Sequence, residues 1–175
     1  MEELKKDWLR SHEDFKTHYE TKYDSSLEPP AWMIFETATF GITSKFYNNI
    51  KYNITEKAEI AKYFGFSKSS VKILESWMHH LNTVRNICAH HSRLFSRINI
   101  TRPVFPRNID GKWVNSWCKN DRIYVSICII KRLLDMCAIE CNFLDRLKPI
   151  INAFRKEQFS LMGIPENWES EDLFQ

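Results

Sequence analysis

Residues 85–97, RNICAHHSRLFSR, hold the side chains of this chain that are best suited to chemistry. The segment carries three arginines and two adjacent histidines, and Arg85 stands five residues ahead of His90. An imidazole can take up or release a proton near neutral pH, and a guanidinium offers a planar set of donors that matches phosphate oxygens. Together these groups suit cleavage of an RNA phosphodiester by its own 2′-hydroxyl, because a histidine can move the protons while an arginine stabilises the charge on phosphorus.

The chain around this segment is positively charged throughout. Residues 76–109 contain no aspartate, glutamate or lysine but five arginines and four histidines, although the formal net charge of the whole chain is only +3. A window of this kind is typical of a surface that binds a polyanion, and Arg93, Arg97 and Arg102 are candidate RNA phosphate contacts. A solvated basic turn is the alternative. We expect no cofactor and no metal, because Cys88 and the histidines beside it lack a second ligand cluster at zinc spacing.

A long helix, capped by Ser67 or Ser69 and running to about His91, must position these groups. At about 100° per residue, an apolar arc forms that includes Arg85, between positions 74 and 78. His90 falls about 140° away, on the polar side with Asn86. Since Arg85 and His90 do not face each other, we expect a homodimer in which two copies of the helix complete the site.

The other polar residues of this helix have plainer expected roles. A guanidinium on an apolar face needs a partner, and Glu36 is the candidate for a structural ion pair with Arg85. His91 is a second-rank site residue, whereas His79 and His80 are expected at the surface, with Glu75 pairing with His79.

The remaining sequence predicts an all-α bundle. Glycine is scarce (4 residues) and 43% of residues are apolar, which favours long helices around one core. Trp32 and Trp77 are expected in that core, and Trp113 and Trp117 are expected to anchor an irregular loop at about 100–119, with a hairpin near residues 110–111. Helices are expected at residues 2–23, 31–50 (after Pro29 and Pro30), 55–64 (ending at Gly65), 121–141 and 144–159 (interrupted at Pro149).

Composition also bears on the compartment. The N-terminal residues are charged, so they do not form a signal peptide, and the longest apolar region, 123–139, is too short and too charged to span a membrane. The five cysteines are odd in number and form no CxxC pair, which fits free thiols in a reducing compartment. We therefore expect a cytoplasmic protein that does not associate with membranes.

The string LNTVRNICAHHSRLFSR resembles the corresponding helix of the Abi-like (abortive-infection bacteriophage resistance) family, and its R-N-x-x-x-H core resembles the motif of HEPN domains. An earlier tract, PPAWMIFETATFGITSKFY, resembles a second block of that family; the matching residues are Trp32, Met33, Glu36, Phe40, Gly41, Ser44 and Tyr47.

The resemblance covers most of residues 15–160. It implies a HEPN-like helical domain that is usually dimeric, a role in phage defence with RNA as the target, and a catalytic pair of Arg85 and His90 with Asn86 orienting one of them. It divides the chain into an N-terminal helix (1–24), which would end a longer N-terminal region, an Abi domain (25–160) and an acidic C-terminal tail (161–175).

Two function classes remain open on this reading. The first is a metal-independent endoribonuclease acting as a toxin, held in check by a neutralising partner. The second is a non-catalytic RNA- or protein-binding module in which Arg85 is only a structural ion pair. A helix-turn-helix DNA reader at residues 55–78 is a third reading, disfavoured because its second helix is needed for the core.

Overall fold

The computed structural model describes residues 2–23, 28–67, 70–106, 109, 111–115, 118–138 and 141–175. Within these residues the chain forms nine α-helices and two short 3-10 helices and contains no strand, so the expected all-α class is confirmed. The chain divides into two compact units, residues 1–50 and 51–175, which are described separately below. No helix among the described residues is long and apolar enough to cross a bilayer.

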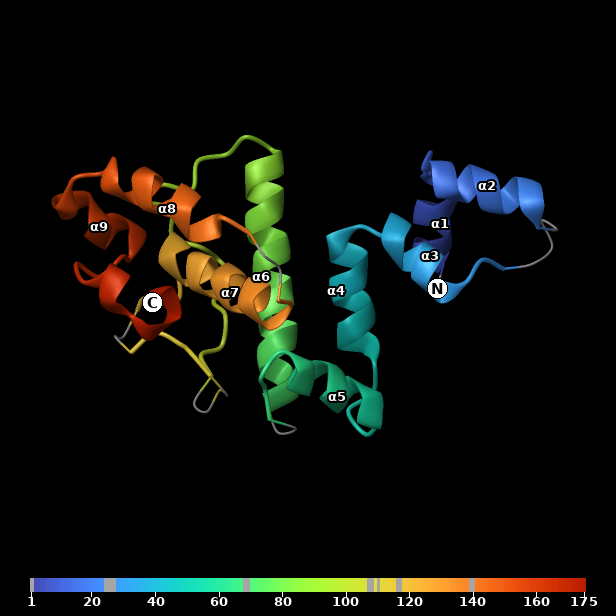
Figure 1. Cartoon of the computed structure of the whole chain (residues 1–175), viewed down its shortest axis with the longest axis horizontal. Coiled ribbons are helices and arrows are strands. Elements are labelled where there is room, and N and C mark those ends of the chain that lie inside the picture. The colour runs from blue at the N-terminus through green and yellow to red at the C-terminus, as the bar shows by residue number, and fades with distance from the viewer. Residues whose placement is uncertain are drawn as a thin grey trace. The chain divides into compact units, whose positions relative to one another are not determined.

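The first unit contains four helices, α1 (Glu2–Arg10), α2 (Asp14–Lys22), α3 (Ala31–Thr37) and α4 (Phe40–Asn49) (Figure 1). The sequence predicted two long helices here, and both are broken. The first breaks at residues 11–13, and the second breaks at Ala38, where Thr39 then caps α4 by accepting the N–H of Ile42 at 3.4 Å. Pro29 and Pro30 do precede a helix, which begins at Ala31 as expected.

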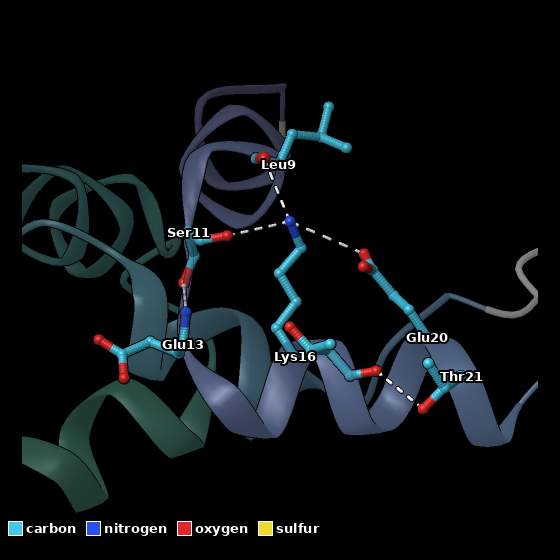
Figure 2. A network of polar contacts seen from close by, with 7 residues as sticks. Leu9, Ser11, Glu13, Lys16, Glu20 and Thr21 are labelled. Atoms are coloured by element: carbon cyan, nitrogen blue, oxygen red, sulfur yellow. Dashed lines mark hydrogen bonds and ion pairs between the residues drawn. The ribbon is translucent and has the colours of Figure 1, made fainter.

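Lys16 explains why the break between α1 and α2 is stable. From α2 its Nζ donates to the carbonyl oxygens of Leu9 and Ser11, each at 3.1 Å, and lies 3.8 Å from Glu20 (Figure 2). The Leu9 carbonyl lies in the last turn of α1 and the Ser11 carbonyl just after it, where a helix end leaves acceptors unpaired and favours a cation. Lys16 therefore helps to hold the corner, together with the Glu13 N–H that donates to Ser11 Oγ at 3.3 Å, and periodicity alone could not single out this lysine.

The exposure of Trp32 corrects a core prediction. Its side chain on α3 is 73% exposed, whereas Trp8 on α1 is buried and lies edge-on to Tyr19 at 6.2 Å between ring centroids. Trp8 and Leu4, one turn apart, are the residues of α1 that the first unit buries.

The second unit is built on α6 (Val71–Ala89), the long green helix of Figure 1, which packs against α5 (Thr55–Tyr63) and α7 (Ile123–Met136). The chain then forms α8 (Phe143–Asn152), α9 (Lys156–Met162) and the 3-10 helices η2 (Trp168–Ser170) and η3 (Asp172–Phe174). One apolar core joins these later elements; its buried members are Cys118, Tyr124, Cys128, Ile151, Phe159, Met162, Ile164, Trp168, Leu173 and Phe174. The acidic segment 161–175 thus supplies half of the buried members of this core.

Several helix ends differ from the expected ones. Gly65 does end α5, with φ +77° and a Phe66 N–H that bonds the carbonyl of Ala61 at 3.0 Å, as a left-handed cap requires. The cap of α6 is Ser70 instead of Ser67, and its side chain makes no capping bond. The helix expected from residue 144 runs through Pro149 and breaks at residues 153–155 instead, and α7 begins at Ile123.

The loop at 100–119 is irregular where it is described, and it is anchored by α6. Trp77 is fully buried, donates its indole N–H to the carbonyl of Val104 at 3.0 Å and stacks on Trp113 at 5.0 Å. The Val104 N–H in turn donates to the hydroxyl of Ser76 at 3.0 Å. The expected core position of Trp77 and the anchoring role of Trp113 are confirmed, while Ser69, Trp117 and the turn at Asp110 lie outside the described residues.

Candidate functional site

The last turn of α6 places both histidines of the motif in solvent. The helix ends at Ala89, His90 occupies the C-cap, and His91 adopts a left-handed conformation with φ +51°. The N–H of His91 bonds the carbonyl of Cys88 at 2.9 Å, and the N–H of Ser92 reaches back to Ile87 at 3.0 Å. This is the geometry of a helix cap that usually has glycine at the left-handed position, which His91 occupies here. Residues other than glycine seldom adopt that backbone conformation.

Asn86 contacts both members of the expected pair. Its side-chain Oδ1 accepts a hydrogen bond from Nη1 of Arg85 at 3.1 Å, and its carbonyl accepts the N–H of His90 at 3.0 Å. The bond to His90 is the ordinary backbone bond of the last helical turn, so the Asn86 side chain contacts Arg85 alone here, and its orienting role remains a prediction. Arg85 and His90 are both exposed.

The expected apolar arc of α6 is displaced around the helix. Arg85 is exposed instead of centred on the buried face, which is formed by Val71, Ile73, Leu74, Trp77, His80 and Val84. Arg85 therefore does not carry the cost of an unpaired buried charge. The expected ion pair with Glu36, an exposed residue of α3, would join the two units and remains a prediction.

His80 lies on the buried face of α6, so its expected surface position is wrong. The side chain is fully buried; Nδ1 lies 3.0 Å from the carbonyl and 3.1 Å from the hydroxyl of Thr101, and Nε2 lies 2.8 Å from the hydroxyl of Ser126 on α7. Burial lowers the pKa of His80, because a buried imidazolium loses its hydration. His80 thus ties the helix that carries the motif to the loop and to α7. A neutral histidine with both nitrogens bonded behaves as a core residue, and helical periodicity cannot identify such a residue.

A buried ion pair secures the other end of α6. Lys57 of α5 has its side chain only 1% exposed; its Nζ lies 2.5 Å from Glu75 Oε1 and 4.3 Å from the ring centroid of Tyr52. The Tyr52 hydroxyl donates to Glu75 Oε2 at 2.7 Å, and that bond raises the pKa of Tyr52 because ionisation would break it. Glu75 therefore pairs with Lys57 and Tyr52, not with His79 as expected. In the sequence, Lys57 lies one turn before Ala61, on the side of α5 that is buried. This spacing could have indicated that Lys57 is buried and needs an acidic partner.

The three arginines predicted to contact phosphates differ in whether they already pair with an acidic side chain. Arg93 is exposed and Arg97 half-buried, and neither forms an ion pair within the part of the chain that the structure describes. Arg102 is exposed, but its Nη2 lies 3.6 Å from Asp121 Oδ2, and Arg122 Nε lies 3.8 Å from the other carboxylate oxygen, Oδ1. Arg93 and Arg97 are therefore the better placed of the three for a ligand. The described residues also contain no group of three or more side chains that could hold a metal ion.

A comparison with known protein families shows which family this chain belongs to. The family model described as Abi-like protein matches residues 1–96, and this match ends just beyond the exposed motif of α6. The chain belongs to the Abi-like protein family. No curated protein and no solved structure matches it. In this Abi-like chain the family match includes Arg85, Asn86, His90, His91 and Arg93, together with the tract around Trp32.

Proposed function

We propose that this chain is a phage-defence protein that acts by cleaving RNA in the cytoplasm, without a metal, at a HEPN-type site formed by Arg85, Asn86 and His90. Membership of the Abi-like family supports the role in abortive infection. The observation that carries the chemical part is the end of α6, where the Asn86 side chain bonds to the exposed Arg85 and the exposed His90 caps the helix.

The chemistry follows from these groups. The imidazole of His90 takes the proton of a 2′-hydroxyl, the 2′ oxygen bonds to phosphorus, and the bond from phosphorus to the 5′ oxygen breaks. The leaving oxygen takes up a proton, and the products are a 2′,3′-cyclic phosphate and a 5′-hydroxyl. Arg85 donates to the phosphate oxygens and stabilises the charge that builds on them, while Asn86 limits the positions open to its guanidinium.

A second copy of the chain completes the site in this proposal. Five residues of α-helix separate Arg85 from His90 by about 140° around the axis and about 7.5 Å along it. One phosphate is reached more readily by the arginine of one copy and the histidine of the other. Arg93, and Arg97 beside it, would then hold the flanking phosphates, with His91 in a supporting position.

The nature of the products tests the reaction. Purified protein is incubated with a labelled RNA and with DNA of the same sequence in excess chelator. The proposal predicts cleavage of the RNA alone, with cyclic phosphate ends. Cleavage of the DNA, or RNA fragments ending in a 3′-hydroxyl, would exclude attack by the 2′-hydroxyl.

A non-catalytic RNA-binding module is the second candidate. It is favoured by the exposed arginines in a stretch without acids, because such a surface binds phosphates whether or not cleavage follows. It predicts RNA retention that weakens steeply with salt and leaves the RNA intact.

A further inference from the structure

The chain makes a tight turn at residues 94–97, just after the motif of α6. The Arg97 N–H closes this turn on the carbonyl of Leu94 at 3.0 Å, and Ser96 adopts a left-handed conformation with φ +58°. Arg97 ends the turn and Arg93 immediately precedes it, and the two ends of such a turn lie within about 7 Å of each other. Neither arginine has an acidic partner among the described residues. The turn therefore holds two like charges close together.

Two contacts hold this turn against the junction of α8 and α9. The rings of Phe95 and Phe154 stack with their centroids 5.4 Å apart and their planes 8° from parallel. Arg122 Nη1 donates both to the carbonyl of Ser96 at 3.0 Å and to the carbonyl of Leu161 on α9 at 3.2 Å. In Figure 1 the segment that leaves α6 accordingly runs toward α8. The turn and the α8–α9 junction therefore form one continuous surface.

Arg155 adds a third cation to this surface. It follows Phe154 directly in the chain, its side chain is exposed, and it has no acidic partner within the described ranges. Its backbone is fixed, because its N–H donates to Gln158 Oε1 at 2.9 Å and its carbonyl accepts the Gln158 N–H at 2.9 Å. The next residue, Lys156, lines a hollow together with Glu166 and Glu169, so acidic side chains lie near its charge. Arg155 is therefore the cation of the junction that is best placed for a ligand.

The arrangement of these charges indicates the kind of ligand. Arg93, Arg97 and Arg155 repel one another unless an anion lies between them. One phosphate ion cannot reach all three, because the Phe95–Phe154 stack separates Arg155 from the other two. A single RNA strand can, since its phosphates follow one another along the backbone, and single strands are bound by basic surfaces that follow that backbone.

We propose that Arg155 binds a phosphate of the RNA strand that leaves the site at the end of α6. The strand passes Arg93 and Arg97, crosses the Phe95–Phe154 stack and reaches Arg155. This inference rests on the proposed function, because it takes RNA as the ligand, but it requires only binding and not cleavage. Arg155 lies outside residues 1–96, which the family model matches, so this part of the surface is a feature of the chain beyond the family match.

Binding of an RNA that cannot be cleaved tests the proposal. The probe is a fluorescent oligouridylate of about 20 nucleotides, longer than the roughly 4–16 that a single-strand site covers, with 2′-O-methyl groups that block the attacking oxygen. The whole chain and its Arg155→Ala and Lys62→Ala variants are compared by fluorescence anisotropy. Lys62 is the matched control, since it is an exposed cation of α5, which contacts the opposite end of α6 through Lys57 and Glu75. At about 0.1 M salt we expect Arg155→Ala to weaken binding about fivefold and Lys62→Ala less than twofold.

The salt dependence of binding separates a phosphate contact from an effect on folding. Each phosphate contact that is lost lowers the slope of log affinity against log salt by about 0.7 for a single strand. Arg155→Ala should therefore lower the slope by about this amount, and Arg97→Ala combined with Arg155→Ala by about twice as much. The melting temperature should stay unchanged in Arg155→Ala, because the bonds to Gln158 use only the backbone of Arg155.

The outcomes distinguish this inference from the proposed function. If Arg155→Ala binds the probe as tightly as Lys62→Ala, or binds it more weakly with an unchanged salt slope, this inference fails and the proposed function stands. If the wild type shows no saturable binding up to about 0.1 mM, both fail, because RNA is then not the ligand. Arg155-dependent binding to phosphatidylserine vesicles, with RNA binding unchanged by the variant, would assign the surface to a membrane and overturn the inference.

Discussion

Replacing His91 by glycine should stabilise the second unit, because His91 caps α6 at φ +51°. The left-handed conformation costs an L-residue roughly 1–2 kcal/mol, and histidine lies toward the low end of that range. Glycine removes this cost but loses about 0.5–1 kcal/mol of chain entropy on folding. The net gain is therefore at most about 0.5 kcal/mol, or a rise of at most about 2 °C in the melting temperature of a unit of this size.

Urea unfolding monitored by circular dichroism measures this gain directly. His91→Ala is the necessary comparison, since it removes the imidazole but keeps a side chain in the left-handed conformation, and it should not stabilise. Ala138 has φ +50° after α7, so Ala138→Gly should give a similar gain without touching the motif. A His91→Gly variant no more stable than His91→Ala would refute the reasoning. If His91 supports the site, the same glycine variant will also cleave RNA more slowly than the wild type, so that stability and activity move in opposite directions.

Three further predictions concern the supports and the composition of the site. Lys57→Ala should cost about 3–5 kcal/mol of unfolding free energy, because it leaves Glu75 half-buried without its cation, and the double variant with Glu75→Leu should recover part of that loss in urea unfolding. His80 is held neutral by burial, so its folded pKa lies below the unfolded value of 6.5; stability should therefore fall as the pH drops through 6.5, and His80→Gln should flatten that dependence in unfolding curves at pH 7.5 and 5.5. Mixing Arg85→Ala with His90→Ala protein, after brief denaturation and refolding together, should restore up to about a quarter of wild-type cleavage, since the mixed dimer keeps one intact shared site; a site within one chain would regain none.

The sequence predicted where helices form better than it predicted which side of a helix is buried. Apolar periodicity identified the long helix that carries the motif, and Gly65 correctly marked the end of α5. The same periodicity placed Arg85 inward and His80 outward, and both placements are wrong. The reason is physical: periodicity counts apolar side chains, whereas His80 is buried because Thr101 and Ser126 satisfy both of its nitrogens. Those partners are distant in sequence, so no local pattern could reveal them.

Helix breaks were missed for a related reason. At the α1–α2 corner, Lys16 bonds the carbonyl of Leu9 at the end of α1 and that of Ser11 just beyond it, and the sequence of a polar amphipathic stretch looks the same with or without such a corner. The residues of the candidate site were easier to find, because Arg85, Asn86 and His90 lie within six residues at one helix end and their types already suggest chemistry. Their exposure, and the hydrogen bond between the side chains of Asn86 and Arg85, required the structure.

Cleavage of RNA by the His90→Ala variant tests the central claim most directly. Wild type, His90→Ala and His18→Ala are compared on the same labelled RNA in excess chelator, with His18 as the control because it is an exposed histidine on α2. Matching melting temperatures establish that all three proteins are folded. The account predicts that wild type and His18→Ala cleave alike and that His90→Ala loses at least about 100-fold in rate, as expected for removal of a general base. Equal cleavage by His90→Ala and wild type would contradict it.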